Sequence, residues 1–333
     1  MCGTDVHEYL AGPILLPGHG ITNEHTGATV PLIMGHEFSG TVREVGNDVK
    51  GISVGQAIAV NPSMSCQHHG HKPCVVCEAG RPNVCLRSTF YGLHAQGGGF
   101  ADEICVDQLA VVPLPETVPL KLAALAEPLS VAAHMVRISG FEAGQSAVVL
   151  GAGPIGCALI LFLRDRGAKS ILVSEVAASR VEQAKACGAD RVVDPTQSKT
   201  AVSDAVQEVM APGADVAFDA CGIQATLDEA FNITKPGGTV FNVAIHEKPL
   251  SLNLNNVTLH EKRLMGGNAY TREDFEYVVR YIADHAELVE SFISAIVPLE
   301  SAVDGAFAEL VRNKVAHNKI LVQVAGDGEK ARL

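Results

Sequence analysis

The sequence lacks an apolar run close to the roughly 18 to 20 residues that a membrane-spanning helix requires. Its longest candidate, CALILFL at 157–163, is far too short. Basic residues are also scarce, since 25 Lys and Arg stand against 37 Asp and Glu and give a net charge of −12. This balance disfavours nucleic acid and anionic membranes as partners, because both bind preferentially to clustered Lys and Arg side chains. No basic segment followed by an apolar one opens the chain, so no signal peptide and a cytoplasmic location are expected.

Cysteines are few and unevenly spread: four of the nine lie between positions 66 and 85. Clustering of this kind in a chain without a secretion signal indicates a metal site before disulfides. Cys74-x-x-Cys77 is a typical knuckle of a thiolate zinc site, and Cys66 and Cys85 lie within loop reach. Four thiolates leave no open position, so the predicted site is structural. The alternatives are a fortuitous pair with exposed thiols, or replacement of Cys66 by His68, His69 or His71.

The middle of the chain, from about 146 to 267, alternates β-branched runs with amphipathic stretches. This alternation predicts βαβ units and a parallel sheet. Strands are predicted at 146–150, 170–174, 214–220 and 237–245, with helices at 154–167, 179–188 and 224–234. Flanking segments predict strands at 38–46, 101–114 and 319–324 and helices at 122–138, 272–285 and 300–313. Pro128 is expected to keep Glu127 extended and to begin the helix after it.

The stretch SAVVLGAGPIG predicts a dinucleotide site where a buried strand meets a helix. Gly151 allows the tight turn, Gly153 lets backbone approach a pyrophosphate, and Gly156 permits close helix packing. Phosphates would sit on the helix N-terminus, which Pro154 and Ile155 open. Glu175 ends the next strand, where it would bind ribose hydroxyls and repel a 2′-phosphate, so NAD is favoured, with Arg180 the one contrary residue. The alternative is a glycine-rich turn before a core helix.

Three separated pieces carry further reactive groups: Cys2, Thr4 and His7 at the start, His36-Glu37, and Glu127 before Pro128. Singly, each has an ordinary structural explanation. Beside a nicotinamide fold and a four-cysteine lobe, they indicate a second metal site. Three protein ligands of mixed S, N and O type leave one position for substrate, which is the pattern of a catalytic zinc.

These features resemble the zinc-containing medium-chain alcohol and polyol dehydrogenases from Cys2 to about Val324. The motifs are CGTDVHEY, GHEFSGTVREVG, GGGFADE, EPLSVAAH, GAGPIG and PGGTVFNVA. The resemblance implies an α/β fold with a GroES-like β-rich catalytic domain (1–128 and 269–333) and a Rossmann domain (129–268). It implies two Zn²⁺ per chain. By this resemblance, the catalytic zinc is held by Cys2, His36 and Glu127, and Glu37 can enter or leave the metal shell. Thr4 and His7 form a proton relay. The structural zinc is held by Cys66, Cys74, Cys77 and Cys85.

The insert at 11–32 and the long gap between Cys66 and Cys74 look most like the butanediol (acetoin-forming) dehydrogenase branch. The resemblance thus implies NAD-dependent hydride transfer to and from a secondary alcohol or vicinal diol, with a small alcohol or ketone as partner. A homodimer or homotetramer is the expected assembly. Sorbitol-, xylitol- or threonine-type dehydrogenases are the alternatives. Because the chain lacks the family's first strands, the catalytic domain is expected to be incomplete, and a truncated relative without turnover is another alternative.

Overall fold

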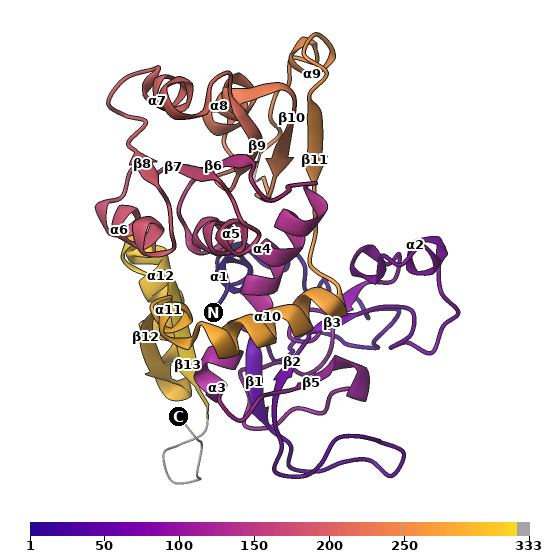
Figure 1. The fold of residues 1–333 in the computed structure, drawn as a ribbon. Helices are drawn as coiled ribbons and strands as arrows, with labels where there is room; N and C mark the ends of the chain where they lie inside the picture. Colours follow the sequence, from indigo (N-terminus) through magenta and orange to yellow (C-terminus); the bar gives the residue numbers. More distant parts are fainter. Residues whose placement is uncertain (247, 325–333) are drawn as a thin grey trace. The chain divides into compact units, whose positions relative to one another are not determined.

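The computed structural model describes residues 1–246 and 248–324, shown as a ribbon in Figure 1. The chain divides into two compact units, each considered by itself below. Unit 1 contains residues 1–130 and the chain from 269 on, and unit 2 contains 131–268. The domain predicted over 269–333 extends past the described residues at 325–333.

Unit 2 is built on one six-stranded parallel sheet in the order β11-β10-β9-β6-β7-β8. Its central strands are runs of Ala, Val, Ile, Leu and Phe that are buried on both faces, as parallel strands require. The order reverses between β6 and β9, and such a switch point is where doubly wound sheets bind ligands. The strands are β6 Ser146–Leu150, β7 Ser170–Ser174, β8 Arg191–Val193, β9 Ala214–Asp219, β10 Thr234–Asn242 and β11 Arg263–Gly266.

Helices cover both faces of this sheet, with α5 and α6 on one side and α7 and α8 on the other (Figure 1). Burial of Val202, Ala205, Val206 and Met210 gives α7 its apolar face, at the spacing of an amphipathic helix. The sequence analysis did not predict α7. The helices are α5 Pro154–Asp165, α6 Ala178–Ala186, α7 Ala201–Met210, α8 Gln224–Ile233 and α9 Asn255–Thr258.

Unit 1 contains small sheets: antiparallel β1-β2-β5, antiparallel β3-β4, and parallel β12-β13. The strands are β1 Phe38–Thr41, β2 Ala57–Val60, β3 Ser63–Met64, β4 Thr89–Phe90, β5 Val111–Pro113, β12 Ile293–Pro298 and β13 Lys319–Gln323. The α-helices are α1 Gly3–Ala11, α2 Val75–Glu78, α3 Leu120–Ala123, α10 Arg272–Asp284, α11 Ala286–Glu290 and α12 Ala308–Arg312. Short 3₁₀ turns lie at Pro82–Val84, Gln108–Ala110, Leu299–Ser301 and Lys314–Ala316.

Two predicted helices differ from the observed ones. Helix α4 spans Ala126–Ile138, so Glu127 is helical and the expectation that Pro128 keeps it extended was wrong. A proline in the first turn is tolerated because the N–H that it lacks has no intrahelical partner there. The helix predicted at 300–313 is broken by a π-helical turn, Val303–Phe307, in which Gly305 lies against Val297 of β12.

No helix in the described part of the chain is both long and apolar enough to cross a membrane.

Candidate metal centres and cofactor site

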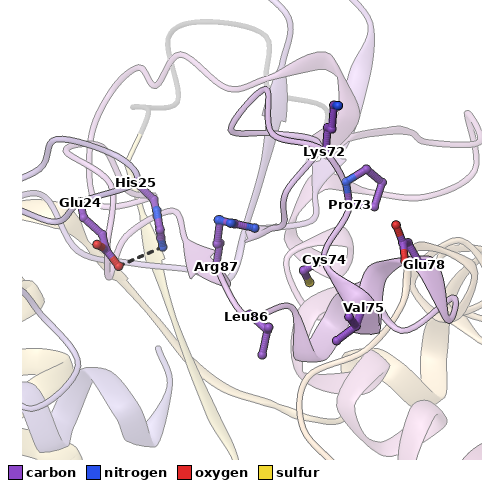
Figure 2. Close-up of a pocket in the computed structure, with 9 residues that line it drawn as sticks. All are labelled: Glu24, His25, Lys72, Pro73, Cys74, Val75, Glu78, Leu86 and Arg87. Atoms are coloured by element: carbon purple, nitrogen blue, oxygen red, sulfur yellow. Dashed lines mark ion pairs between the residues drawn. The ribbon is translucent and has the colours of Figure 1, made fainter.

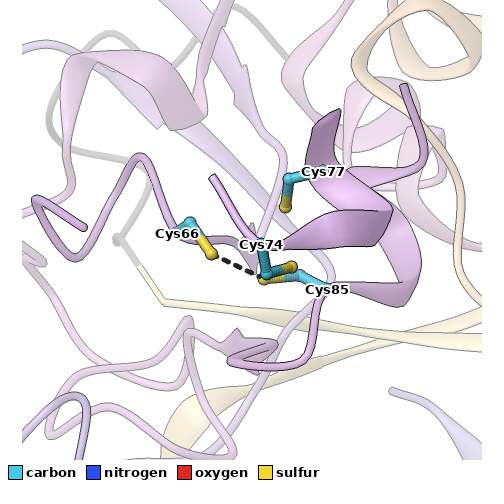
Figure 3. A group of neighbouring side chains, drawn as sticks. All are labelled: Cys66, Cys74, Cys77 and Cys85. Carbon is cyan, nitrogen blue, oxygen red and sulfur yellow. Dashed lines mark hydrogen bonds between the residues drawn. The ribbon is translucent and has the colours of Figure 1, made fainter. Parts of the chain in front are cut away.

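Four cysteines from separate turns of unit 1 meet at one point (Figure 3). Their sulfur atoms all lie within 4.8 Å of one another, with Cys66 Sγ 3.4 Å and Cys74 Sγ 3.9 Å from Cys85 Sγ. Sulfurs at about 2.3 Å from one tetrahedral zinc would be roughly 3.8 Å apart. Helix α2 begins directly after Cys74 and carries Cys77, and Cys85 follows a 3₁₀ turn. The set therefore fits a structural zinc.

Local hydrogen bonds make the four thiols unequal acids. Backbone donors hold the pKa of Cys74 at about 6, whereas burial and neighbouring thiols raise the pKa of Cys77 to about 12. Arg87 faces the cluster, since its backbone N–H donates to Cys85 Sγ at 3.3 Å and its Nη1 to Cys66 Sγ at 3.4 Å. This cation offsets part of the negative charge that four thiolates would carry.

The histidines considered as replacements for Cys66 lie outside the sulfur set. Among the described residues, the four thiols form the set by themselves. His68 Nδ1 instead accepts from the Ser65 N–H at 3.0 Å, and His69 Nε2 pairs with Thr89 Oγ1 at 3.0 Å.

A second set of metal-ligating atoms, also in unit 1, comes from Cys2, His36 and Glu37, again within 4.8 Å of one another. Cys2 caps helix α1, and His36 follows Gly35, whose φ of +96° turns the chain against Phe100. His36 is buried, and its Nδ1 lies 3.4 Å from Asp5 Oδ1 without reaching hydrogen-bond geometry. A thiol, an imidazole and a carboxylate whose ligand atoms lie this close together are donors that suit a catalytic zinc.

Asp5 ties the first two of these residues together, a role that the sequence analysis did not assign. Its Oδ2 accepts from the Cys2 N–H at 2.8 Å, and its Oδ1 lies 3.4 Å from His36 Nδ1. Burial by itself lowers the pKa of His36, but Cys2 and Asp5 outweigh burial and raise it well above its usual value. A carboxylate behind an imidazole is the usual second partner that orients a ligating histidine.

Glu37 is held by two nitrogens. Lys319 Nζ donates to Oε1 at 2.7 Å, and the Met1 nitrogen donates to Oε2 at 3.0 Å. Burial alone would raise the pKa of Glu37, but these positive groups hold it far below its usual range. Glu37 is therefore held as an anion, with Lys319 as its side-chain partner. Sequence spacing gave no signal for Lys319.

Glu127 is buried beside this set but is not among its ligand atoms in the described structure. The Tyr270 hydroxyl donates to its Oε1 at 2.8 Å. Burial raises the pKa of Glu127 to about 7, although His36 opposes the shift. Its predicted role as a ligand stays a prediction.

Thr4 and His7, the predicted proton relay, lie one helical turn apart on α1. Thr4 is half-buried and His7 is exposed, so the pair runs from the interior of unit 1 toward water. Positions three apart share a helix face.

In unit 2, the glycine turn follows β6 at the switch point. Gly151 has φ +95°, and a Cβ on Gly156 would lie 1.9 Å from Gly151 O. A Cβ on Gly153 would meet no other atom within 4 Å. Gly153 caps α5, and Pro154 and Ile155 open it. Two glycines thus serve the fold, whereas Gly153 leaves space above the helix N-terminus that suits a pyrophosphate.

Glu175 is already oriented by the backbone. Its Oε2 accepts from Ala152 N, and its Oε1 accepts from Val176 N and Ala177 N, each at 2.8 Å. A carboxylate has about four acceptor sites, which leaves room for a ribose hydroxyl. Arg180, half-buried on α6, is the nearby predicted cation.

A doubly wound sheet with this glycine turn, in a chain with two metal-ligand sets, defines a metal-dependent nicotinamide dehydrogenase. Comparison with known proteins agrees. Residues 1–116 match the alcohol dehydrogenase GroES-like domain, and residues 154–284 match the zinc-binding dehydrogenase family. The chain belongs to this zinc-binding alcohol dehydrogenase family.

Individual relatives cover nearly the whole chain. An (R,R)-butanediol dehydrogenase of Saccharomyces cerevisiae is 39% identical over 99% of this chain and 90% of its own length. A probable (R)-acetoin-forming diacetyl reductase 2 of the same yeast is 36% identical over 100% and 83%. The crystal structure of 2R,3R-butanediol dehydrogenase from Bacillus subtilis has a TM-score of 0.89 at 33% identity, covering 98% of this chain and 90% of that one.

The predicted family, the α/β fold with GroES-like and Rossmann parts, and the predicted enzyme class are confirmed. The chain is an oxidoreductase of small alcohols, and zinc and NAD(H) are its cofactors.

Proposed function

We propose that the chain oxidises a vicinal diol such as 2,3-butanediol with NAD and reduces the corresponding hydroxyketone in reverse. The observation that carries the proposal is the set of Cys2, His36 and Glu37, built around the buried His36, whose donors suit a catalytic zinc. The names of the relatives support the choice of diol.

In this proposal, Cys2, His36 and Glu127 hold the catalytic zinc, and Glu37 exchanges with them as an additional carboxylate. When bound, zinc supplies the Lewis acidity that lowers the pKa of an alcohol, and NAD supplies the hydride acceptor. Asp5 and Tyr270 orient their partners His36 and Glu127 through the contacts described. The four-cysteine set holds the structural zinc.

Proton transfer is assigned to helix α1. The Thr4 hydroxyl accepts the proton of the substrate hydroxyl, and exposed His7 passes it to solvent. Positioned acid–base groups of this kind contribute typically about 10²- to 10⁴-fold in rate. Thr4→Val is therefore expected to cut turnover while zinc content stays unchanged, and wild-type turnover in this variant would contradict the relay.

The preference for NAD over NADP rests on Glu175, whose charge next to the ribose site would repel a 2′-phosphate. Among the residues proposed for the cofactor site, Arg180 on helix α6 carries the positive charge that could favour a 2′-phosphate. We also propose a cytoplasmic location. The proposed assembly is a homodimer or homotetramer, and light scattering would determine which of the two it is.

The decisive experiment compares Glu127→Ala with Glu116→Ala, an exposed glutamate of the same unit. NAD-coupled oxidation of 2,3-butanediol stereoisomers, sorbitol, xylitol and threonine is measured, together with NAD binding and zinc content. Glu127→Ala should lose activity by more than about 100-fold and keep NAD binding, while Glu116→Ala stays like wild type. Faster turnover of a polyol or of threonine by the wild type would overturn the diol assignment.

A further inference from the structure

Three histidines of unit 1 that belong to neither metal-ligand set lie close together: His25, His69 and His71. His69 and His71 belong to the turn that runs from Cys66 to Cys74, and His25 comes from the separate segment 11–32. The fold brings these segments together, since the ring centroids of His25 and His69 are 5.5 Å apart. His71 lies 6.3 Å from His25 and 6.4 Å from His69.

These separations approach those of a three-histidine metal site. Imidazole nitrogens at about 2.0–2.1 Å from one zinc place the ring centroids roughly 5 Å apart. The trio is not one of the sets whose ligand atoms lie within 4.8 Å in the described chain. A cation would therefore have to draw the rings together by about 1 Å through side-chain rotation, which exposed His71 permits.

The backbone and neighbouring side chains already orient the cluster. His69 Nε2 pairs with the buried Thr89 hydroxyl at 3.0 Å, and this contact orients the ring. His25 Nε2 lies 3.3 Å from Glu24 Oε1, as Figure 2 shows. The backbone N–H of His25 donates to Asn23 Oδ1, and the backbone N–H of His71 donates to Cys66 O. These bonds fix the backbone at both ends of the cluster.

Electrostatics also favour neutral imidazoles here. Burial, and then the neighbouring His25 and His71, lower the pKa of His69, and only the neutral ring can ligate. Arg87 and His25 both line a pocket of about 610 Å³ (Figure 2), but the Nη1 of Arg87 donates to the Cys66 sulfur. Its charge is thereby partly compensated by the thiols.

We propose that His25, His69 and His71 form an accessory site for a divalent transition-metal cation, most simply Zn²⁺, separate from the two zinc sites above. Imidazole donors suit zinc, copper and nickel, whereas calcium and magnesium prefer oxygen. Exposed His71 leaves one side of the site open to solvent. A bound cation would cross-link segment 11–32 to the turn after Cys66 and stabilise both in proportion to its occupancy.

The test is a calorimetric titration of Zn²⁺ into protein dialysed until its zinc content is constant. Because tightly held zinc exchanging with added zinc produces little heat, only a new site should be visible. We expect one further saturable equivalent in the wild type. A double variant, His69→Ala with His71→Ala, should lose it while its zinc content after dialysis stays unchanged.

Matched variants make the result specific. His19→Ala removes an exposed histidine of segment 11–32 outside the cluster and should bind the added zinc like wild type. Thr89→Val should weaken binding roughly 10- to 100-fold through loss of the orienting hydroxyl. His25→Ala serves if the double variant does not fold. No further equivalent in the wild type, undiminished binding without His69 and His71, or equal loss in His19→Ala would overturn the proposal.

Discussion

At the scale of single residues, different glycines of the turn serve folding and cofactor binding. Gly156→Ala should lower both the thermal stability and NAD affinity, because its Cβ would collide with the Gly151 carbonyl, a backbone atom that cannot yield cheaply. Gly153→Ala should leave thermal stability near wild type and weaken NAD binding, since its Cβ occupies otherwise open space. Thermal melts and NAD titrations check both variants. Equal NAD affinity in Gly153→Ala and wild type would contradict the assignment of the pyrophosphate site.

Tyr270 offers a second residue-scale prediction. Tyr270→Phe removes the hydroxyl that donates to Glu127, which should weaken catalytic zinc by roughly 10- to 100-fold, as for other groups that orient ligands. Zinc retention is measured against a chelator of graded concentration, with Tyr277→Phe as control. Unchanged retention in Tyr270→Phe would mean that Glu127 does not depend on this hydrogen bond.

How far the sequence predicts site residues depends on locality. The cysteine knuckle and the glycine turn have fixed spacings, so sequence patterns identify candidates for each. Lys319 and Tyr270 reach Glu37 and Glu127 from 282 and 143 residues away, and no local pattern links such pairs. Asp5 lies in a quoted motif, but its two contacts became evident only when α1 and His36 were placed in space.

At the scale of elements, Asp215 joins the start of β9 to the start of β6. Its Oδ2 accepts from Ser146 N at 2.8 Å and Ser146 Oγ at 2.9 Å, and Lys235 pairs with Oδ1 at 2.5 Å. Burial raises the pKa of Asp215, but these partners lower it below its usual value. The carboxylate therefore stabilises the fold above its unfolded-state pKa, near pH 4, and this contribution is lost as pH falls through the lower folded-state pKa.

Asp215→Asn should accordingly reduce the free energy of unfolding at neutral pH by about 1–3 kcal/mol. Most of the loss is expected from the Ser146 hydrogen bonds, because the ion pair with half-exposed Lys235 contributes little. Urea denaturation at several pH values measures the difference, which should shrink below about pH 4. A difference independent of pH would contradict the role of the charge.

The sheet interior gives a packing prediction. Phe218 of β9 is fully buried, with its ring centroid 5.5 Å from that of Phe241 in β10. Phe218→Ala should cost about 3–5 kcal/mol of unfolding free energy, because the neighbouring strands cannot close the cavity. Denaturant melts measure this cost. An effect below about 1 kcal/mol would show that the neighbouring residues collapse into the cavity.

Element prediction succeeded where one periodicity dominates. The runs at 146–150 and 170–174 became β6 and β7 with their predicted bounds, because central parallel strands are continuous β-branched runs. The segment 300–313 has the sequence pattern of a helix, but it contains a π-helical turn in which Gly305 lies against Val297 of β12, a contact that local propensity does not encode. The edge strand β8 has only three residues and was missed, since so short a run carries little pattern.

At the scale of the whole molecule, zinc content reports the two metal sites separately. Cys77→Ser should reduce zinc from two equivalents to one per chain and lower the melting temperature, because a structural zinc contributes folding free energy directly. Cys105→Ser, an exposed cysteine outside the set, should change neither. Elemental analysis and thermal melts provide both readouts. Two equivalents in Cys77→Ser would place the structural metal elsewhere.

Because Lys319 lies near the end of the sequence, the residues around the two metal-ligand sets are synthesised at different times. All four cysteines lie within 66–85, so their site is complete early in translation. Lys319, which pairs with Glu37 of the second set, follows later, because ribosomes adding about 5–20 residues per second reach it roughly 10 to 50 s after Cys85. The four cysteines are thus all synthesised early, whereas Glu37 gains its lysine partner only when almost the whole polypeptide has emerged.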